Sequence, residues 1–174
     1  SKLDKICHHF HLSLQSGCDE TLKRMNRRYT TEEFRNVVNL LRNTYNDVIL
    51  TTDIIVGFPG ETEEEFKKTY EFLQEIKFYK MHVFKYSKRS GTKAAIMPNQ
   101  IKPEIQEERS KKLIELSDLN QKEYNKQYLG KTLEVLFEEQ SGEYIKGHTQ
   151  NYIVVNVKGN ISSFHNEIIN VKIV

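Results

Sequence analysis

Hydrophobic and polar positions divide the chain into three strand-and-helix units followed by a stretch of short strands. The first expected strand, residues 9–15, alternates between an apolar face (Phe10, Leu12 and Leu14) and a polar face (His11, Ser13 and Gln15). An apolar face toward covering helices and a polar face toward a cavity is what a barrel strand near an active site would show. The short turn after this strand, residues 16–19, predicts the start of a short helix.

The most informative segment is residues 51–62, TTDIIVGFPGET. The β-branched run at 54–56 is too short for a helix and predicts a strand buried on both faces. Gly-Phe-Pro-Gly ends that strand, and Thr62 with Glu65 forms a capping box that begins a helix. Because parallel sheets bind ligands at the carboxyl ends of their strands, we expect Asp53 and residues 57–61 to border a site. The segment has neither a P-loop nor a dinucleotide fingerprint, and an ordinary connection remains the alternative.

Two further helices and a third strand complete this half of the chain. Thr30 and Glu33 form a second capping box, and the helix that follows is expected to bury Phe34, Val37, Val38 and Leu41. Residues 81–87 predict a strand, with residues 88–92 as its polar exit loop. Pro103 suits the first turn of a long helix that ends near residue 128, with apolar positions at Leu113, Leu116 and Leu119.

Beyond residue 128 the pattern becomes that of a small all-β unit. Four short strands are expected at 131–138, 144–149, 152–157 and 168–174, separated by turns rich in Gly, Asn and Ser. This pattern is similar to an OB-like barrel. We therefore predict two domains, residues 1–128 and residues 129–174, and an α/β fold class for the whole chain.

Charge is distributed unevenly along the sequence. Residues 61–76 carry six acids against two bases, which is typical of a solvated helix face. Residues 77–103 carry seven bases and no acid, interleaved with Phe78, Tyr79, Phe84 and Tyr86. Bases with aromatics are typical of a surface that contacts phosphates and stacks on nucleobases, although a solvated loop is the alternative. The β region from 129 to 174 has four lysines against five acids, so any RNA binding there depends on local grouping.

Composition excludes several classes of protein. No apolar run approaches the roughly 20 residues needed to span a bilayer, and no signal-peptide pattern opens the chain, so we expect a cytoplasmic protein without membrane contact. Cys7 and Cys18 are too few for a disulfide framework. Cys7 and the histidines that follow it do not predict zinc, because successive strand residues point to opposite faces and no second ligand pair follows.

Several blocks taken together resemble one family. They are HLSLQSG at 11–17 with MNRRYT at 25–30, TDIIVGFPGET at 52–62, and HVFKYSKRSGT at 82–92. These blocks resemble the radical S-adenosylmethionine tRNA methylthiotransferases, most nearly the branch acting on threonylcarbamoyl-adenosine. GHTQNY at 147–152 is similar to the TRAM RNA-binding domain that ends these enzymes. The likeness covers nearly the whole chain.

The resemblance implies a fold, cofactors and a limit on activity. The three strands would be the fourth to sixth of a six-stranded partial barrel, followed by a TRAM domain. Members of the family use S-adenosylmethionine and two iron–sulfur clusters, one of them on a Cys-x-x-x-Cys-x-x-Cys loop. Two cysteines cannot hold a four-cysteine cluster, so we expect the chain to be the C-terminal part of a longer enzyme and to be catalytically incompetent alone, with no catalytic or metal-binding residue of its own.

The resemblance and the strand geometry together suggest which residues bind which ligand. The residues expected to contact S-adenosylmethionine are Gln15, Ser16, Arg27, Asp53, Gly57 and Glu61. Arg27 is the natural partner of the methionine carboxylate, because a planar guanidinium matches a carboxylate with two hydrogen bonds. The residues expected to contact the tRNA anticodon loop are Tyr86, Ser87, Arg89, Gly91, Thr92, Lys146, His148, Asn151 and Tyr152.

Two other interpretations stay open at this point. One is a stand-alone, non-catalytic RNA-binding protein, which differs from the enzyme in lacking a cluster-bearing region upstream. The other is a complete small α/β enzyme that dimerises to close its sheet. Three strand-and-helix units cannot close a barrel, so the first strand would leave an exposed edge through which the chain self-associates.

Overall fold

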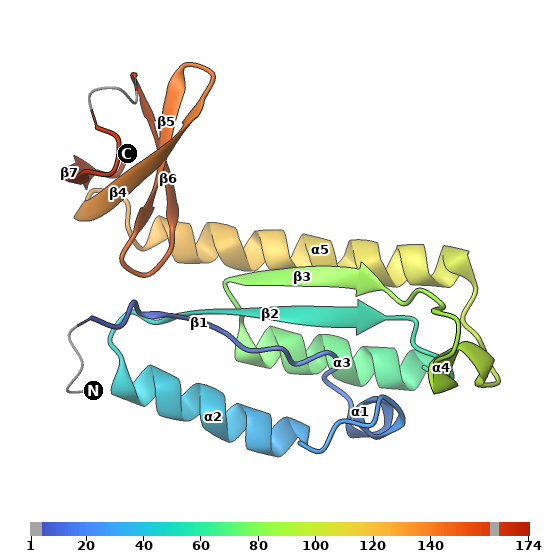
Figure 1. Ribbon diagram of the computed structural model, residues 1–174. Helices are drawn as coiled ribbons and strands as arrows, with labels where there is room; N and C mark the ends of the chain where they lie inside the picture. Colours follow the sequence, from blue (N-terminus) through green and yellow to red (C-terminus); the bar gives the residue numbers. More distant parts are fainter. Residues whose placement is uncertain (1–4, 161–163) are drawn as a thin grey trace.

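Three parallel strands form the sheet of the larger half of the molecule (Figure 1). The computed structural model describes residues 5–160 and 164–174. The strands are β1 (His9–His11), β2 (Ile49–Val56) and β3 (Lys80–Lys85), and they are ordered β1-β2-β3. Each strand therefore lies next to the one that follows it in sequence, as successive units of a barrel do. This arrangement confirms the predicted parallel-strand half barrel.

Helices α2 (Thr31–Thr44), α3 (Glu63–Ile76) and α5 (Pro103–Lys126) cover one face of this sheet. The short helices α1 (Asp19–Arg24) and α4 (Lys93–Ile96) lie near the carboxyl ends of the strands (Figure 1). Figure 1 shows α2 and α3 side by side and α5 running alongside β3. Both predicted capping boxes are present at the starts of α2 and α3, and Pro103 lies in the first turn of α5. No helix in the described part of the chain has the length and apolar character needed to cross a membrane.

The main core lies between the sheet and these helices. Its fully buried side chains come from both layers: Leu14, Leu50 and Ile54 from the strand side, and Val38, Leu73 and Leu113 from α2, α3 and α5. Phe10, Leu12 and Leu14 all pack into this core, so the predicted apolar face of residues 9–15 is confirmed. The opposite face carries the polar side chains of Asp53 and His82 together with the apolar side chains of Ile55 and Phe84.

The remainder of the chain is a curled antiparallel sheet of four strands. These are β4 (Thr132–Ser141), β5 (Tyr144–Thr149), β6 (Val154–Lys158) and β7 (Ile168–Lys172), ordered β6-β5-β4-β7. Val135, Phe137 and Ile145 form its core. Gly147 lets β5 approach β4, because a Cβ atom there would lie 2.4 Å from the carbonyl oxygen of Leu136. The predicted domain boundary falls between α5 and β4 and stays a prediction.

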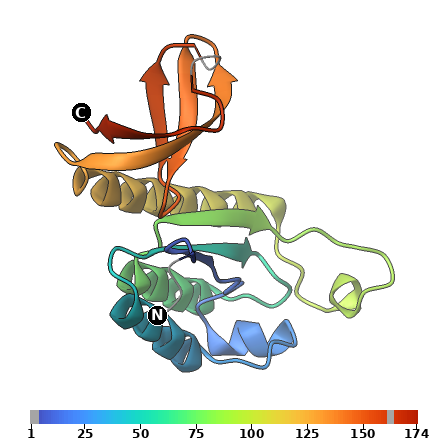
Figure 2. The ribbon, with the colours of Figure 1, turned by 60° about the vertical axis from the view of Figure 1, so that its left-hand side comes forward.

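The curled sheet stands at the end of the molecule where the parallel strands begin, beside the end of α5 (Figures 1 and 2). Tyr128 joins the two parts: its hydroxyl donates to Asp47 Oδ1 at 2.6 Å and accepts from Asn151 Nδ2 at 2.9 Å. Asn151 also donates to the carbonyl of Asp47 at 3.2 Å. Burial, reinforced by the Asp47 carboxylate, raises the pKa of Tyr128, so the hydroxyl stays a hydrogen-bond donor.

Three expectations about single elements were wrong. Regular pairing of β1 ends at His11, because the chain turns and Gln15 adopts a positive φ of 70°. Val37 and Leu119 are largely exposed, since the buried stripes of α2 and α5 pass through Val38, Leu113 and Leu116 instead. The strand at residues 54–56 was expected to be buried on both faces, but Ile55 is only half-buried, on the face that no helix covers. The short helix α4 was not predicted; Thr92 begins it by accepting a hydrogen bond from the Ala95 N–H.

Candidate cofactor and RNA site

A chain of polar contacts follows the uncovered face of the parallel sheet. Thr51 Oγ1 lies 3.1 Å from His9 Nε2 and 3.0 Å from His11 Nδ1. His11 Nε2 in turn lies 3.1 Å from Asp53 Oδ2. The sheet register places His82 of β3 beside Asp53, and its ring centroid is 5.9 Å from that of His11. Asp53 therefore lies on the polar face within a network of histidines, and in the middle of β2, not at the strand end where it was expected.

Gln15 and Ser16 follow the first strand, but they differ in whether the side chain already has a hydrogen-bond partner inside the protein. The Gln15 backbone bridges to β2, donating to the Asp53 carbonyl at 2.8 Å, while no hydrogen bond engages its side-chain amide among the described residues. Ser16 is buried, and its hydroxyl lies 3.1 Å from Thr69 Oγ1 and accepts from the Cys18 N–H. Gln15 thus has a free amide for a ligand, whereas the Ser16 side chain is held within the fold.

Arg27 lies on an exposed loop that Tyr29 ties to the end of the first strand. The Tyr29 hydroxyl donates to the carbonyl of Leu14 at 2.9 Å. Burial raises the pKa of Tyr29, and the positive charge of Arg27 opposes that rise. No ion pair engages Arg27 among the described residues. Its guanidinium is therefore available to a carboxylate.

A buried ion pair with α5 holds the loop after β2 in place. Arg109 of α5 donates from Nη1 to Glu61 Oε1 at 2.7 Å, and both side chains are only 5–6% exposed. Glu61 also accepts from the N–H of Gly57 at 3.2 Å. Burial raises the pKa of the Glu61 carboxyl, while the Arg109 charge and the Gly57 N–H oppose that rise. This environment gives Glu61 a structural role in shaping the loop, and its contact with the cofactor stays a prediction.

Gln106 connects the loop after β2 to the end of β3. Its side-chain Nε2 donates to the carbonyl of Gly57 at 3.2 Å and to that of Tyr86 at 3.3 Å. Gly57 has a positive φ of 72°, and a Cβ atom there would lie 2.3 Å from Gln106 Cγ. Only glycine suits both the backbone conformation and the close contact. Both backbone groups of Gly57 are engaged within the protein, and its contact with the cofactor stays a prediction.

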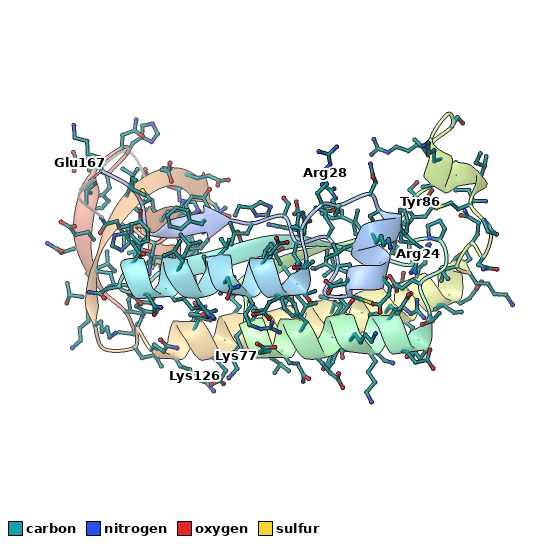
Figure 3. The ribbon with its side chains drawn as sticks, turned by 90° about the horizontal axis from the view of Figure 1, so that it is seen from below. Arg24, Arg28, Lys77, Tyr86, Lys126 and Glu167 are labelled. Carbon is teal, nitrogen blue, oxygen red and sulfur yellow. The ribbon has the colours of Figure 1, made fainter. Side chains whose placement is uncertain are left out.

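Tyr86 lies at the carboxyl end of β3 with its hydroxyl buried and without a partner among the described residues. The edge of its ring meets Phe58, with centroids 5.3 Å apart. Figure 3 shows Tyr86 and Arg24 at the same end of the molecule, far from Glu167 in the curled sheet. An unsatisfied buried hydroxyl costs about 1–3 kcal/mol, so a ligand that supplies a partner would be favoured.

The remaining predicted RNA residues at this end lie in the exit loop. Ser87, Arg89 and Gly91 are exposed. Thr92 is also exposed, but its hydroxyl donates to the Arg89 carbonyl at 2.8 Å and caps α4. The structure thus places Gln15, Asp53 and Tyr86 on neighbouring strands, with the exit loop beyond them.

The predicted RNA residues of the curled sheet are largely engaged inside the protein. Lys146 pairs with Glu139 at 3.3 Å, and His148 lies 2.7 Å from Glu138. Asn151 is buried in the contact with Asp47 and Tyr128. The Tyr152 ring stacks on His148 at 4.4 Å and on His9 of β1 at 4.8 Å. Tyr152 and Asn151 therefore join the two sheets, and their contact with RNA stays a prediction.

The described residues do not fit an iron–sulfur cluster. Cys7 is exposed, whereas Cys18 is buried beside Glu20, to which its thiol donates at 2.9 Å. Within the described part of the chain, no group of three His, Cys, Asp or Glu side chains is arranged to hold a metal ion. Cluster ligands would have to come from residues outside this sequence.

Several residues of the site were not identified from the sequence, namely Tyr29, His82, Gln106 and Arg109. One signal was available for Arg109: it lies four residues before Leu113 and therefore on the buried stripe of α5, where an unpaired charge is rare. The partners of Tyr29 and Gln106 are backbone carbonyls that are distant in sequence, and no local pattern predicts them.

Comparison with known proteins gives matches over nearly the whole chain. The Radical SAM superfamily matches residues 1–73. The threonylcarbamoyladenosine tRNA methylthiotransferase MtaB of Bacillus subtilis is 47% identical over 161 residues, which are 90% of this chain and 36% of that protein. The tRNA-2-methylthio-N(6)-dimethylallyladenosine synthases of Caldicellulosiruptor saccharolyticus and Acetivibrio thermocellus are 43% and 42% identical over 98% of this chain and 36% of each relative. The chain thus spans little more than a third of these relatives, and its resemblance to the radical S-adenosylmethionine tRNA methylthiotransferases is confirmed.

Proposed function

We propose that the chain is the C-terminal part of a tRNA methylthiotransferase that adds a methylthio group to carbon two of a threonylcarbamoyl-modified adenosine next to the anticodon. The observation that carries this proposal is the 39–47% identity to methylthiotransferases over 90% or more of the chain. The threonylcarbamoyl branch is supported by 47% identity to MtaB, against 39–43% for the dimethylallyladenosine synthases.

In this proposal the strand tips form one wall of the S-adenosylmethionine site. Arg27 would bind the methionine carboxylate and Gln15 its ribose or amino-acid part, which is supported by the absence of side-chain partners for either residue among the described residues. Asp53, three residues before the end of β2, would line the same wall deeper along the sheet. Ser16, Gly57 and Glu61 would shape the wall through the contacts that hold the loops. S-adenosylmethionine and the clusters supply the radical and sulfur chemistry once bound in the complete enzyme.

The experiment uses the protein encoded by the complete reading frame, reconstituted with iron and sulfide. With S-adenosylmethionine and tRNA carrying threonylcarbamoyl-adenosine, nucleoside mass spectrometry should detect the methylthio product. tRNA carrying dimethylallyl-adenosine should be modified far more slowly. Equal rates on both tRNAs would contradict the branch assignment, and no product with either would contradict the enzyme itself. The 174-residue chain alone should produce no 5′-deoxyadenosine, which tests its predicted incompetence.

A second candidate, a non-catalytic RNA-binding protein in a cytoplasmic setting, is favoured by the presence of only two cysteines in the chain. The same reading frame separates the two candidates, because a cluster-binding cysteine motif upstream supports only the enzyme.

The role of Arg27 in the cofactor wall has its own test. The variant Arg27→Ala in the complete enzyme should weaken S-adenosylmethionine binding by at least tenfold, as expected from losing a charge-assisted, two-bond contact worth about 1.5–3 kcal/mol. An unchanged affinity would show that Arg27 does not bind the methionine carboxylate.

A further inference from the structure

Two loops at the carboxyl end of the parallel sheet carry bases without acids. Residues 21–31, which follow the first strand, contain Lys23, Arg24, Arg27 and Arg28 and no Asp or Glu. Residues 85–102, which follow β3, contain five further bases and again no acid. The acids of this half of the chain are concentrated instead on the outer helices α3 and α5.

Seven of these nine cations have no ion pair among the described residues, and all seven are exposed: Lys23, Arg27, Arg28, Lys88, Arg89, Lys93 and Lys102. The other two differ, since Arg24 pairs with Glu65 and Lys85 pairs with Glu107 at 2.8 Å. Arg27 is assigned to the methionine carboxylate, and we call Arg28, Lys88, Arg89 and Lys93 the strand-tip rim. Figure 3 shows the Arg28 side chain extending to the same side of the molecule as α4.

The two loops flank the central loop after β2 and are joined through it. Arg24 packs against Gly60, where a Cβ atom would lie 3.3 Å from Arg24 Nε. The Gly60 N–H donates to the carbonyl of Asn99 at 2.9 Å, which ties the central loop to the segment after α4. The rim cations are therefore held on both sides of the candidate cofactor wall.

In the curled sheet three of the four lysines are engaged, and the fourth, Lys172, is exposed without an ion pair among the described residues. Lys158 pairs with Glu143 at 2.7 Å, and Lys146 pairs with Glu139. Lys131 lies over the Tyr128 ring, 5.1 Å from its centroid. A phosphate that approached these lysines would have to displace a carboxylate or a ring that already holds them. With five glutamates against four lysines, this sheet also attracts polyanions poorly.

We infer that the strand-tip rim, and not the curled sheet, supplies most of the phosphate contacts to the tRNA, an inference that rests on the proposed role in tRNA modification. Unpaired, exposed cations release counterions from RNA without first breaking an internal ion pair, and counterion release dominates the affinity of such complexes. The rim surrounds the place where the substrate adenosine must meet the cofactor. The curled sheet then serves to fix the geometry of the sheet start through Asn151 and Tyr152.

The test compares two triple variants of the 174-residue chain that remove the same charge. The rim variant is Arg28→Gln with Lys88→Gln and Lys93→Gln, and the matched control is Lys131→Gln with Lys146→Gln and Lys158→Gln. Binding to a fluorescein-labelled anticodon stem–loop RNA is titrated at several salt concentrations between about 50 and 200 mM. Circular dichroism and thermal melting check that both variants fold.

The rim variant should lose about ten- to hundredfold in affinity at low salt, and its slope of log K against log salt should fall by about 2–3, close to 0.7–0.9 for each lost contact. The control should change affinity by less than about threefold and keep the slope. A control that loses as much as the rim variant, or a rim variant that binds like the parent chain, would overturn the inference. Modification of tRNA by the complete enzyme is measured separately, so failure of the rim and failure of the proposed reaction are distinguishable.

Discussion

The two ends of the parallel sheet differ in how their charged side chains are engaged. At the carboxyl end, a buried ion pair between Arg109 and Glu61 holds the loops, and the cations outside it are left free. At the amino end, hydrogen bonds from Tyr128 and Asn151 to Asp47 dock the curled sheet, and most lysines of that sheet are engaged. β2 alone separates these ends by roughly 26 Å, at about 3.3 Å per residue. The contrast indicates that ligand contact is concentrated at the carboxyl end and structural docking at the amino end.

The largest expected effect comes from breaking the buried pair. Arg109→Met leaves the Glu61 carboxylate buried and uncompensated, and should lower the free energy of unfolding by about 3–5 kcal/mol in a urea titration followed by circular dichroism. Lys112→Met is the matched control, because Lys112 lies on the same helix and pairs with Glu108 in solvent. The control should cost less than about 1 kcal/mol. Equal losses for the two variants would contradict a special role for the buried pair.

A smaller effect is expected where the curled sheet docks. Tyr128→Phe removes one hydroxyl and leaves both Asp47 and Asn151 short of a partner, which should cost about 1–3 kcal/mol of unfolding free energy. Tyr144→Phe, on β5 and largely exposed, is the control and should stay within about 0.5 kcal/mol of the parent. If both changes were neutral, the hydrogen bonds of Tyr128 would not be what holds the two parts together.

The smallest predicted effect is a pH dependence at the ring stack between His9 and Tyr152. Burial, with a contribution from the charge of His11, lowers the pKa of His9 below its ordinary value. Between that lowered pKa and the unfolded value of about 6.5, the unfolded chain binds more protons, so stability rises with pH. Acidification from pH 7.5 to about 5.5 should therefore cost less than about 1 kcal/mol through this group.

His9→Phe tests the assignment, because it keeps a ring against Tyr152 while removing the titration. Chemical denaturation at a series of pH values should give a shallower dependence for the variant than for the parent chain below about pH 6.5. Identical slopes would show that His9 does not contribute.

Local signals in the sequence predicted most of the fold. The capping boxes of Thr30 with Glu33 and Thr62 with Glu65 fixed two helix starts, because the side chains that satisfy the free N–H groups are neighbours in sequence. The predictions for Leu119 and Val37 were wrong, since which apolar residues are buried depends on where a helix lies against the sheet. The left-handed backbone of Gln15, which ends regular pairing early, follows from tertiary contacts with β2 and not from its residue type.

The candidate site was predicted less completely. Alternation correctly assigned His11 to the polar face, because residue parity alone decides this, whereas Asp53 was expected at a strand end and lies in the middle of β2. Motif position could not tell a free side chain such as Gln15 from an engaged one such as Ser16, because their partners lie more than 50 residues away or do not exist. The same limit applies to the curled sheet, where Lys146 and His148 were expected to face RNA but are paired with glutamates.

Hydrogen exchange of the complete enzyme, with and without its tRNA, tests the division between the two ends most directly. Peptides covering residues 23–31 and 85–93 should exchange more slowly when tRNA is bound, whereas peptides from residues 144–158 should change little. Protection confined to residues 129–174, with the strand-tip loops unaffected, would contradict the assignment of the RNA contact to the carboxyl end of the sheet.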